Sequence, residues 1–90
     1  MSKTGRGVFV DTDRIRYVGW HDASRRVKPA RKLAEAMELY VEKRGRPADI
    51  CLTSPGEALE LAGNVPGVLV QGRSYMEFGK YYVGEMRRDA

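Results

Sequence analysis

The sequence predicts a small α+β domain in which a mixed β-sheet of about five strands carries one long helix packed on one face. Three observations lead to this class. Short apolar, β-branched segments occur near both ends of the 90 residues, residues 29–45 have a helical periodicity, and turn-forming residues separate these segments. The expected order along the chain is β-β-α-β-α-β-β. Hairpins at each end and a crossover in the middle imply both parallel and antiparallel strand pairs.

Two strands are expected near the N-terminus. The segment "GVFV" (7–10) is short and apolar, and "IRYVGW" (15–20) alternates its larger side chains between two faces. Between them, "DTDR" (11–14) is a turn candidate, because Asp and Thr side chains hydrogen-bond to their own backbone. These segments together predict a β-hairpin with a four-residue loop.

The long helix is expected over residues 29–45, after the polar connection "HDASRRVK" (21–28). Pro29 suits a first helical turn, where its missing N–H is no loss, and Gly45 is a common C-terminal stop. The apolar positions recur at helical spacing and predict one buried stripe. That stripe consists of Ala30, Leu33, Ala34, Met37, Tyr40 and Val41.

The C-terminal half is expected to contain three strands and a short helix. The strands are "ICLT" (50–53), "GVLVQ" (67–71) and "KYYVGEM" (80–86), and the helix is "PGEALELAG" (55–63). The apolar pattern of all these elements predicts the core. We expect it to contain Val8, Val10, Ile15, Tyr17, Leu33, Met37, Tyr40, Val41, Ile50, Leu52, Leu59, Val68, Val70 and Val83.

Length and composition limit the organisation of the chain. We expect a disordered basic tail at 1–6, a single domain at 7–86 and a C-terminal tail at 87–90, since 90 residues are too few for two cores. The single cysteine, Cys51, excludes an internal disulfide and favours a reducing, cytoplasmic location. Because the sequence has no apolar run of roughly 18–20 residues, we expect no membrane partner.

Ser54 is the residue that most resembles a catalytic or binding group, and three interpretations of it are open. It could be a nucleophile on a strand-to-helix turn, a phosphate-binding group, or the N-cap of the short helix. The residues "SPGE" (54–57) match the S-x-x-E capping box. Pro55 lacks the N–H that a nucleophile elbow would use as an oxyanion donor. We therefore favour the cap, whose loss would cost about 1 kcal/mol.

The other chemistry-bearing residues favour structural roles. Asp11 and Asp13 form a D-x-D pair that could hold a divalent cation, but no third carboxylate is near and Arg14 follows directly. His21 has no second histidine or cysteine beside it, and Cys51 lies within an apolar strand without neighbouring positive charge. We therefore expect no catalytic residue, no metal, no cofactor and no enzymatic activity.

Positive charge concentrates in the first third of the chain. Residues 1–32 carry nine Lys and Arg against three Asp, whereas residues 33–90 carry seven against nine acidic residues. Cations interleaved with aromatic rings suit nucleic acid, the cations for phosphates and the rings for bases. The sequence thus predicts a binding module that contacts nucleic acid through residues 14–32. The candidate contact residues are Arg14, Arg16, Trp20, Arg25, Arg26, Lys28, Arg31 and Lys32.

A second interpretation is a protein-interaction or self-assembly module that uses the C-terminal strands, residues 67–86. These strands are low in charge, and one of them at a sheet edge would be available for pairing with another chain. Large side chains near them could form an exposed apolar patch. They are Tyr75, Met76, Phe78, Tyr81, Tyr82 and Met86.

Overall fold

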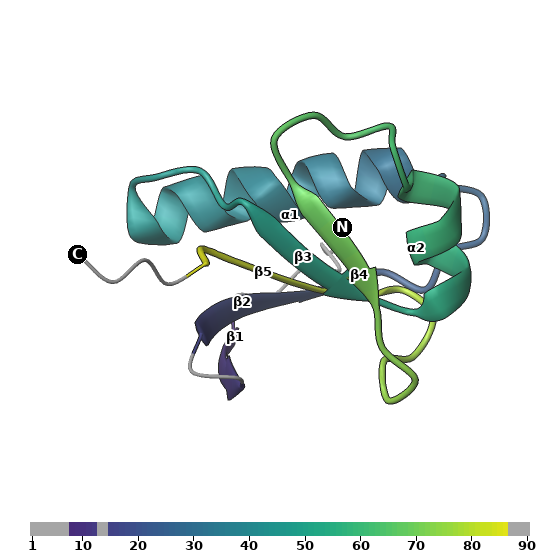
Figure 1. Ribbon diagram of the computed structural model, residues 1–90, viewed down its shortest axis with the longest axis horizontal. Coiled ribbons are helices and arrows are strands. Elements are labelled where there is room, and N and C mark those ends of the chain that lie inside the picture. The colour runs from purple at the N-terminus through teal and green to yellow at the C-terminus, as the bar shows by residue number, and fades with distance from the viewer. Residues whose placement is uncertain (1–7, 13–14, 87–90) are drawn as a thin grey trace.

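A mixed sheet carries both helices on one of its faces (Figure 1). The computed structural model describes residues 8–12 and 15–86, so the expected tails at 1–6 and 87–90 and the candidate Arg14 lie outside the described residues. The elements in chain order are β1 (Val8–Thr12), β2 (Ile15–His21), α1 (Pro29–Arg44), β3 (Ile50–Thr53), α2 (Pro55–Leu61), β4 (Leu69–Gly72) and β5 (Lys80–Gly84). The α+β class predicted from the sequence is confirmed.

The N-terminal strands form the expected antiparallel hairpin, but its loop is shorter than the sequence suggested. Asp11 pairs with Arg16 and Thr12 pairs with Ile15, so both residues belong to β1 and not to a turn. Strand pairing satisfies their backbone groups more completely than local side-chain bonds would. The metal pair considered for Asp11 and Asp13 therefore begins inside a strand, and Asp13 lies outside the described residues.

Among the described residues, five strands form one sheet in the order β1-β2-β5-β3-β4. The last strand, β5, pairs antiparallel with β2 on one side and with β3 on the other, so it lies in the interior of the sheet. The pair β3 and β4 is parallel, and α2 forms the crossover between them. The strand β4 therefore forms one edge.

The main core lies between the sheet and the helices. In projection, α1 lies along the sheet and α2 stands at one end of it (Figure 1). Strand residues facing the helices, such as Val18, Cys51 and Tyr81, are fully buried. They pack with Leu33 and Tyr40 of α1, and Leu61 of α2 belongs to the same cluster.

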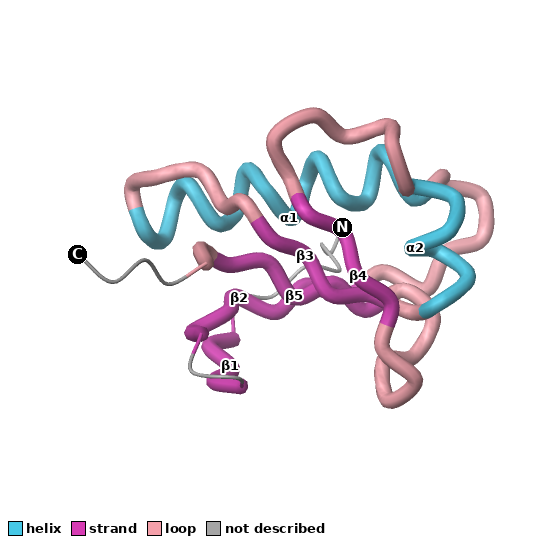
Figure 2. The backbone as a smooth tube through the Cα atoms, viewed as in Figure 1, coloured by secondary structure: helices cyan, strands magenta, loops and turns pink. Residues whose placement is uncertain are grey.

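A smaller apolar cluster lies on the opposite face of the sheet. Tyr17, Ile50 and Leu52 are buried there together with Met76, which comes from the loop between β4 and β5. Figure 2 shows this loop descending from the end of β4 on the side away from α1. Met76 of this loop therefore covers part of this face of the sheet, whereas the helices cover the other face.

The buried face of α1 differs from the predicted stripe. Lys32, Leu33, Ala36 and Tyr40 are buried, whereas Val41 is 46% exposed and Ala34 is exposed. The helix is rotated by about a quarter of a turn from the orientation that apolar spacing alone predicts. The cause is that α1 packs against α2 as well as against the sheet, which draws the Lys32 and Ala36 side inward.

Three further residues that were predicted to lie in the core are not buried. Leu59 of α2 is 79% exposed, because α2 buries Glu57, Ala58 and Leu61 and turns Leu59 to solvent. Val70 is only partly buried, since β4 is an edge strand, and Val68, directly before β4, is partly buried as well.

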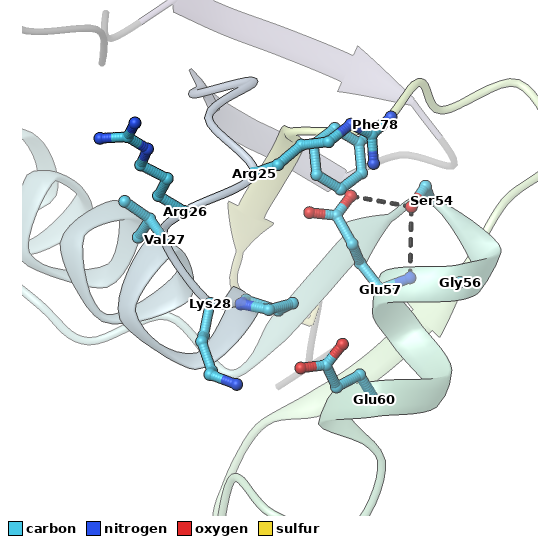
Figure 3. Close-up of a pocket in the computed structure, with 10 residues that line it drawn as sticks. Arg25, Arg26, Val27, Lys28, Ser54, Gly56, Glu57, Glu60 and Phe78 are labelled. Carbon is cyan, nitrogen blue, oxygen red and sulfur yellow. Dashed lines mark hydrogen bonds between the residues drawn. The ribbon is translucent and has the colours of Figure 1, made fainter.

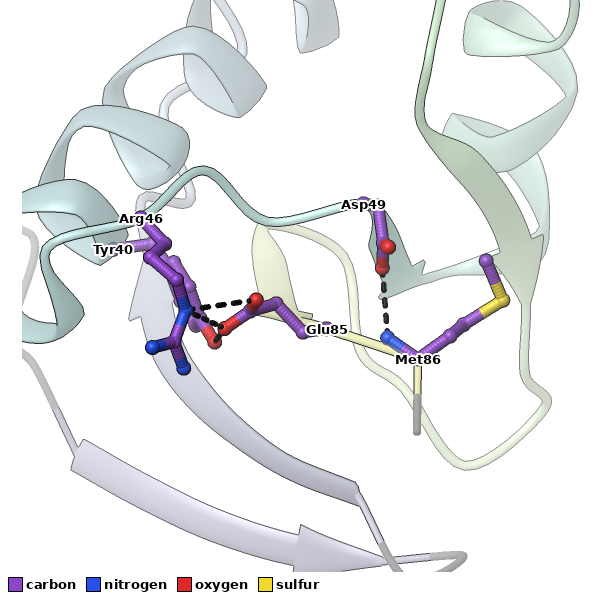
Figure 4. Close-up of polar contacts among 5 residues, drawn as sticks. All are labelled: Tyr40, Arg46, Asp49, Glu85 and Met86. Carbon is purple, nitrogen blue, oxygen red and sulfur yellow. Dashed lines mark hydrogen bonds and ion pairs between the residues drawn. The ribbon is translucent and has the colours of Figure 1, made fainter. Parts of the chain in front are cut away.

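A polar cluster closes the end of the sheet where β5 finishes (Figure 4). The Tyr40 hydroxyl donates to Glu85 Oε1 at 2.9 Å, and Arg46 Nε lies 3.0 Å from Glu85 Oε2. The Met86 N–H donates to Asp49 Oδ1 at 2.8 Å. The Arg46 guanidinium holds the pKa of Glu85 below its ordinary value. These contacts attach residues 85–86 to α1 and to the loop before β3.

Candidate functional site

A pocket with a volume of about 550 Å³ lies between the segment that precedes α1 and the start of α2 (Figure 3). Three basic side chains and one aromatic ring contribute to its wall, together with two carboxylates. The residues that line it are Arg25, Arg26, Val27, Lys28, Pro29, Ser54, Gly56, Glu57, Glu60 and Phe78.

The basic segment, residues 25–28, is held in place by bonds that begin at Gly79. The Asp22 N–H donates to the Gly79 carbonyl at 2.9 Å, and Asp22 Oδ1 accepts from the Ser24 N–H at 2.9 Å. Ser24 Oγ in turn accepts from the Arg26 N–H at 3.2 Å. Such side-chain-to-backbone bonds are the turn chemistry of Asp and Ser. They place the basic segment beside the loop that carries Phe78.

The N-terminus of α1 adds to the positive potential at this pocket. Lys28 is its N-cap and makes no side-chain capping bond, and the first turn contains no acidic residue. The helix dipole makes such an end positive. Arg25, Arg26 and Lys28 place further positive charge at the same end, and the helix would be stabilised by a bound anion.

Glu57 forms the polar floor of the pocket and is 3% exposed. Its Oε1 accepts from the Ser54 hydroxyl at 2.8 Å and from the Gly79 N–H at 2.9 Å, while Oε2 accepts from the Tyr81 hydroxyl at 2.7 Å. A buried carboxylate is stable only with such donors. Burial and the adjacent Glu57 raise the pKa of Tyr81 well above its ordinary value, so this hydroxyl remains a donor.

The N-cap prediction for Ser54 is confirmed, and the role of Glu57 differs from that in a capping box. Ser54 Oγ accepts from the Glu57 N–H at 3.3 Å, as an N-cap does. In a capping box the Glu side chain would return to the backbone N–H of the cap. Here the carboxylate turns inward to bind Gly79 and Tyr81 instead. The Ser54 hydroxyl donates to Glu57 Oε1, and no histidine is among the described residues that line the pocket.

Lys32 is fully buried, contrary to the expectation that it contacts phosphate at the surface. Its Nζ has no hydrogen-bond partner within the described part of the chain and lies 4.3 Å from the centroid of the Phe78 ring. The Arg25 guanidinium also lies 4.3 Å from that centroid. Phe78 therefore interacts with two cations, one at the surface and one in the interior.

The remaining predicted contact residues are dispersed. Trp20 is 5% exposed and packs edge-on against Tyr81, so its ring is not available to stack on a base, contrary to the prediction. Arg16 lies near the other end of β2, over the Phe9 ring at 5.1 Å. Arg31 is exposed and lies 3.5 Å from Glu35. Of the eight candidates, the structure gathers Arg25, Arg26 and Lys28 around the pocket.

Sequence reasoning missed Phe78 and Glu57 as parts of this site. Phe78 was considered only as a member of an apolar patch, and Glu57 only as a capping residue. A usable signal was present, because Phe78 and Gly79 stand directly before a strand, where a glycine permits close approach of a second segment. Which segment approaches depends on the strand order, which the sequence does not display.

The groups considered for catalysis do not meet at this pocket. His21 is exposed at the end of β2, and Cys51 is fully buried. Burial, with a smaller contribution from Glu57, raises the pKa of the Cys51 thiol to about 12. Within the residues that the structure describes, no three His, Cys, Asp or Glu side chains are grouped so as to hold a metal ion. None of the described helices has the length and apolar character needed to cross a membrane.

Comparisons with protein-family models, with curated proteins and with solved structures give no match to this chain.

Proposed function

We propose that this chain is a non-enzymatic module that binds nucleic acid through phosphate contacts from Arg25, Arg26 and Lys28. The observation that supports the proposal is that these three exposed cations line one pocket at the start of α1, which has no side-chain cap. Lysine and arginine contacts to phosphates supply most of the affinity of proteins for nucleic acid. Arg31, one turn further along α1, extends the same basic surface.

The arrangement of the cations favours an extended polyanion over a compact acidic ligand. Figure 3 shows Arg25 lying against Phe78, Lys28 directed to the α2 side and Arg26 directed away from α2. Side chains that diverge in this way can contact successive phosphates of one strand.

A cytoplasmic location stays a prediction, supported by the use of a single, buried cysteine.

Binding to labelled single-stranded and duplex oligonucleotides, measured by fluorescence anisotropy, tests the proposal. Affinity should fall steeply between about 50 mM and 200 mM salt, because binding releases counterions from the phosphates. Lys28→Ala should lower the slope of log K against log salt by about 1, as expected for one lost phosphate contact.

Lys43→Ala is the matched control, because Lys43 lies in the last turn of the same helix and is also exposed. The two variants have the same net charge, so a long-range effect of charge alone would lower affinity in both. Equal losses in the two variants, or no measurable binding at low salt, would contradict the proposal.

A second candidate function is self-association through β4. This strand forms an edge of the sheet, and its Leu69 is 44% exposed. Tyr75 and Met86 are also exposed, at 59% and 37%. The original interpretation included β5, but β5 is interior, and Tyr81 and Met76 are buried. A second copy that pairs along β4 would continue the sheet and cover Leu69.

Sedimentation velocity over a range of concentrations tests self-association. The wild-type chain should show a dimer that Leu69→Lys abolishes, because the charge would lie within the new interface. Leu59→Lys is the control, since Leu59 is more exposed than Leu69 but lies on α2. A strict monomer at every concentration would exclude this candidate.

A further inference from the structure

Arg25 differs from the other two cations of the pocket because its side chain has a partner. Its Cζ lies 4.3 Å from the centroid of the Phe78 ring, and both residues line the pocket. Within the described part of the chain, the side chains of Arg26 and Lys28 make no hydrogen bond, ion pair or ring contact. Figure 3 shows Arg25 lying against Phe78, whereas Arg26 is directed away from it. The ring thus restrains one of the three cationic groups.

The contact with Phe78 leaves the Arg25 guanidinium free to bind a phosphate. A cation over a ring face uses none of its N–H donors in a hydrogen bond. No hydrogen bond or ion pair joins the Arg25 side chain to another of the described residues, so the N–H groups of its planar fork remain available for phosphate oxygens. A side chain that is already restrained loses less rotamer entropy when it binds.

Phe78 is itself held from two directions. The next residue, Gly79, donates its N–H to Glu57 Oε1 at 2.9 Å, and its carbonyl accepts from the Asp22 N–H at 2.9 Å. From the interior, Lys32 Nζ lies 4.3 Å from the ring centroid and has no hydrogen-bond partner among the described residues. A buried amino group without such a partner is costly, and attraction to the ring offsets part of that cost. Movement of the ring away from Lys32 is therefore unfavourable.

We infer that Phe78 is a positioning residue of the nucleic-acid site, because its ring holds the Arg25 guanidinium at the pocket. This inference rests on the proposed function and deepens it, since it assigns part of the affinity to a residue without charge that acts through Arg25. A cation–π contact near the surface corresponds to about two- to fivefold in an equilibrium constant. We assign this share of the affinity for nucleic acid to the ring.

A double-mutant cycle tests the inference, with a labelled single-stranded oligonucleotide and fluorescence anisotropy as the measurement. Phe78→Leu should lower the affinity about two- to fivefold, although it leaves the net charge unchanged. In the Arg25→Ala chain, Phe78→Leu should cause no further loss, because the group through which the ring acts is absent. Phe78→Tyr should retain the affinity of the wild-type chain, since tyrosine presents an aromatic face to Arg25 as well.

Arg26→Ala is the matched control for the cycle. Arg26 is the adjacent residue, is exposed and is directed away from Phe78. The losses caused by Arg26→Ala and Phe78→Leu should therefore multiply in the double variant. If the losses caused by Arg25→Ala and Phe78→Leu multiply in the same way, Phe78 does not act through Arg25 and the inference is wrong.

Lys32 makes a second background necessary. Without the Phe78 ring its Nζ loses the contact that offsets its burial, so Phe78→Leu should lower the melting temperature. Lys32→Met removes the buried charge, and the cycle is therefore repeated in this background. One measurement needs no variant. In NMR spectra of the wild-type chain, the side-chain protons of Arg25 should be shifted upfield by the ring relative to those of Arg26, both free and with bound oligonucleotide. Equal shifts for the two arginines would contradict the inference.

These experiments separate the inference from the proposed function. Binding that is as tight in Phe78→Leu as in the wild-type chain overturns the positioning role of the ring and leaves the nucleic-acid function standing. Absence of binding by the wild-type chain at low salt overturns both.

Discussion

Gly79 connects the basic segment to the buried carboxylate, and its conformation admits only glycine without strain. Its φ is +87°, and a Cβ built there would lie 2.5 Å from the Asp22 carbonyl oxygen. Its N–H donates to Glu57 and its carbonyl accepts from Asp22. We predict that Gly79→Ala lowers the free energy of unfolding by about 2–4 kcal/mol, because the left-handed conformation and the backbone clash both oppose alanine. Urea unfolding measures the loss.

Gly63→Ala is the control for this prediction. Gly63 also has a positive φ of +77°, but a Cβ there would meet no atom within 4 Å. It should therefore lose only the conformational part, about 1–2 kcal/mol. If both variants lose the same free energy of unfolding, the close contact with Asp22 does not contribute to the loss in Gly79→Ala. Gly79→Ala should also weaken oligonucleotide binding, since the basic segment would be displaced, whereas Gly63→Ala should not.

At the scale of the elements, α1 shows where apolar spacing is ambiguous. Both the predicted stripe and the observed face contain Leu33 and Tyr40, and they differ in whether Val41 or Ala36 accompanies them. We predict that Val41→Lys changes stability by less than about 0.5 kcal/mol, because Val41 is 46% exposed. Ala36→Leu should cost about 1–3 kcal/mol, because Ala36 is fully buried against the core and an extra side chain would overpack it. Thermal unfolding of the two variants checks the orientation, and a larger loss in Val41→Lys would refute it.

Local signals in the sequence predicted the elements well where a few adjacent residues determine the structure. Pro29 and Gly45 bracket α1, and Ser54 caps α2, because caps and breakers act within one turn. The strand ICLT has the predicted limits, Ile50–Thr53. The predictions that were wrong concern features that depend on contacts between distant segments. The rotation of α1 depends on α2, and the burial of Trp20 depends on Tyr81, sixty-one positions later.

The candidate site likewise contains some residues that could be identified from the sequence and others that could not. Arg25, Arg26 and Lys28 could be named from the sequence, because a cluster of cations before a helix is visible there. The role of Phe78 could not be, since it reaches Arg25 and Lys32 only because β5 inserts between β2 and β3. Lys32 illustrates the limit most clearly: a lysine within a basic cluster is expected at the surface, and the packing of α1 places it inside.

At the scale of the whole molecule, three acidic groups in the core have pKa values above their ordinary ones. Burial, then the neighbouring Glu57, raises the pKa of the Cys51 thiol from 9.0 to about 12. Burial and the bond to Glu57 raise the pKa of Tyr81, and burial and the bond to Glu85 raise the pKa of Tyr40. All three groups stay protonated in the folded chain at a pH where the unfolded chain has begun to ionise.

The sign of the pH dependence follows from proton binding. Above the ordinary pKa of each group, the folded state holds more protons than the unfolded state, so stability falls as pH rises. The stabilisation is fully present below pH 9, begins to decline when unfolded Cys51 ionises, and declines faster above pH 10, where the unfolded tyrosines ionise as well. Each group contributes a slope of about 1.4 kcal/mol per pH unit in its window.

We therefore predict alkaline unfolding that steepens above pH 10, measured by urea titrations at successive pH values. Cys51→Ala should lower stability at pH 7, because it leaves a cavity, and should remove the decline between pH 9 and pH 10. Tyr81→Phe should leave that first decline and reduce the slope above pH 10, since phenylalanine has no proton to lose. Unchanged slopes in both variants would mean that the alkaline instability arises outside this core. If each substitution changes the slope of stability against pH only in the pH range where its own group ionises, the alkaline instability arises from these buried groups.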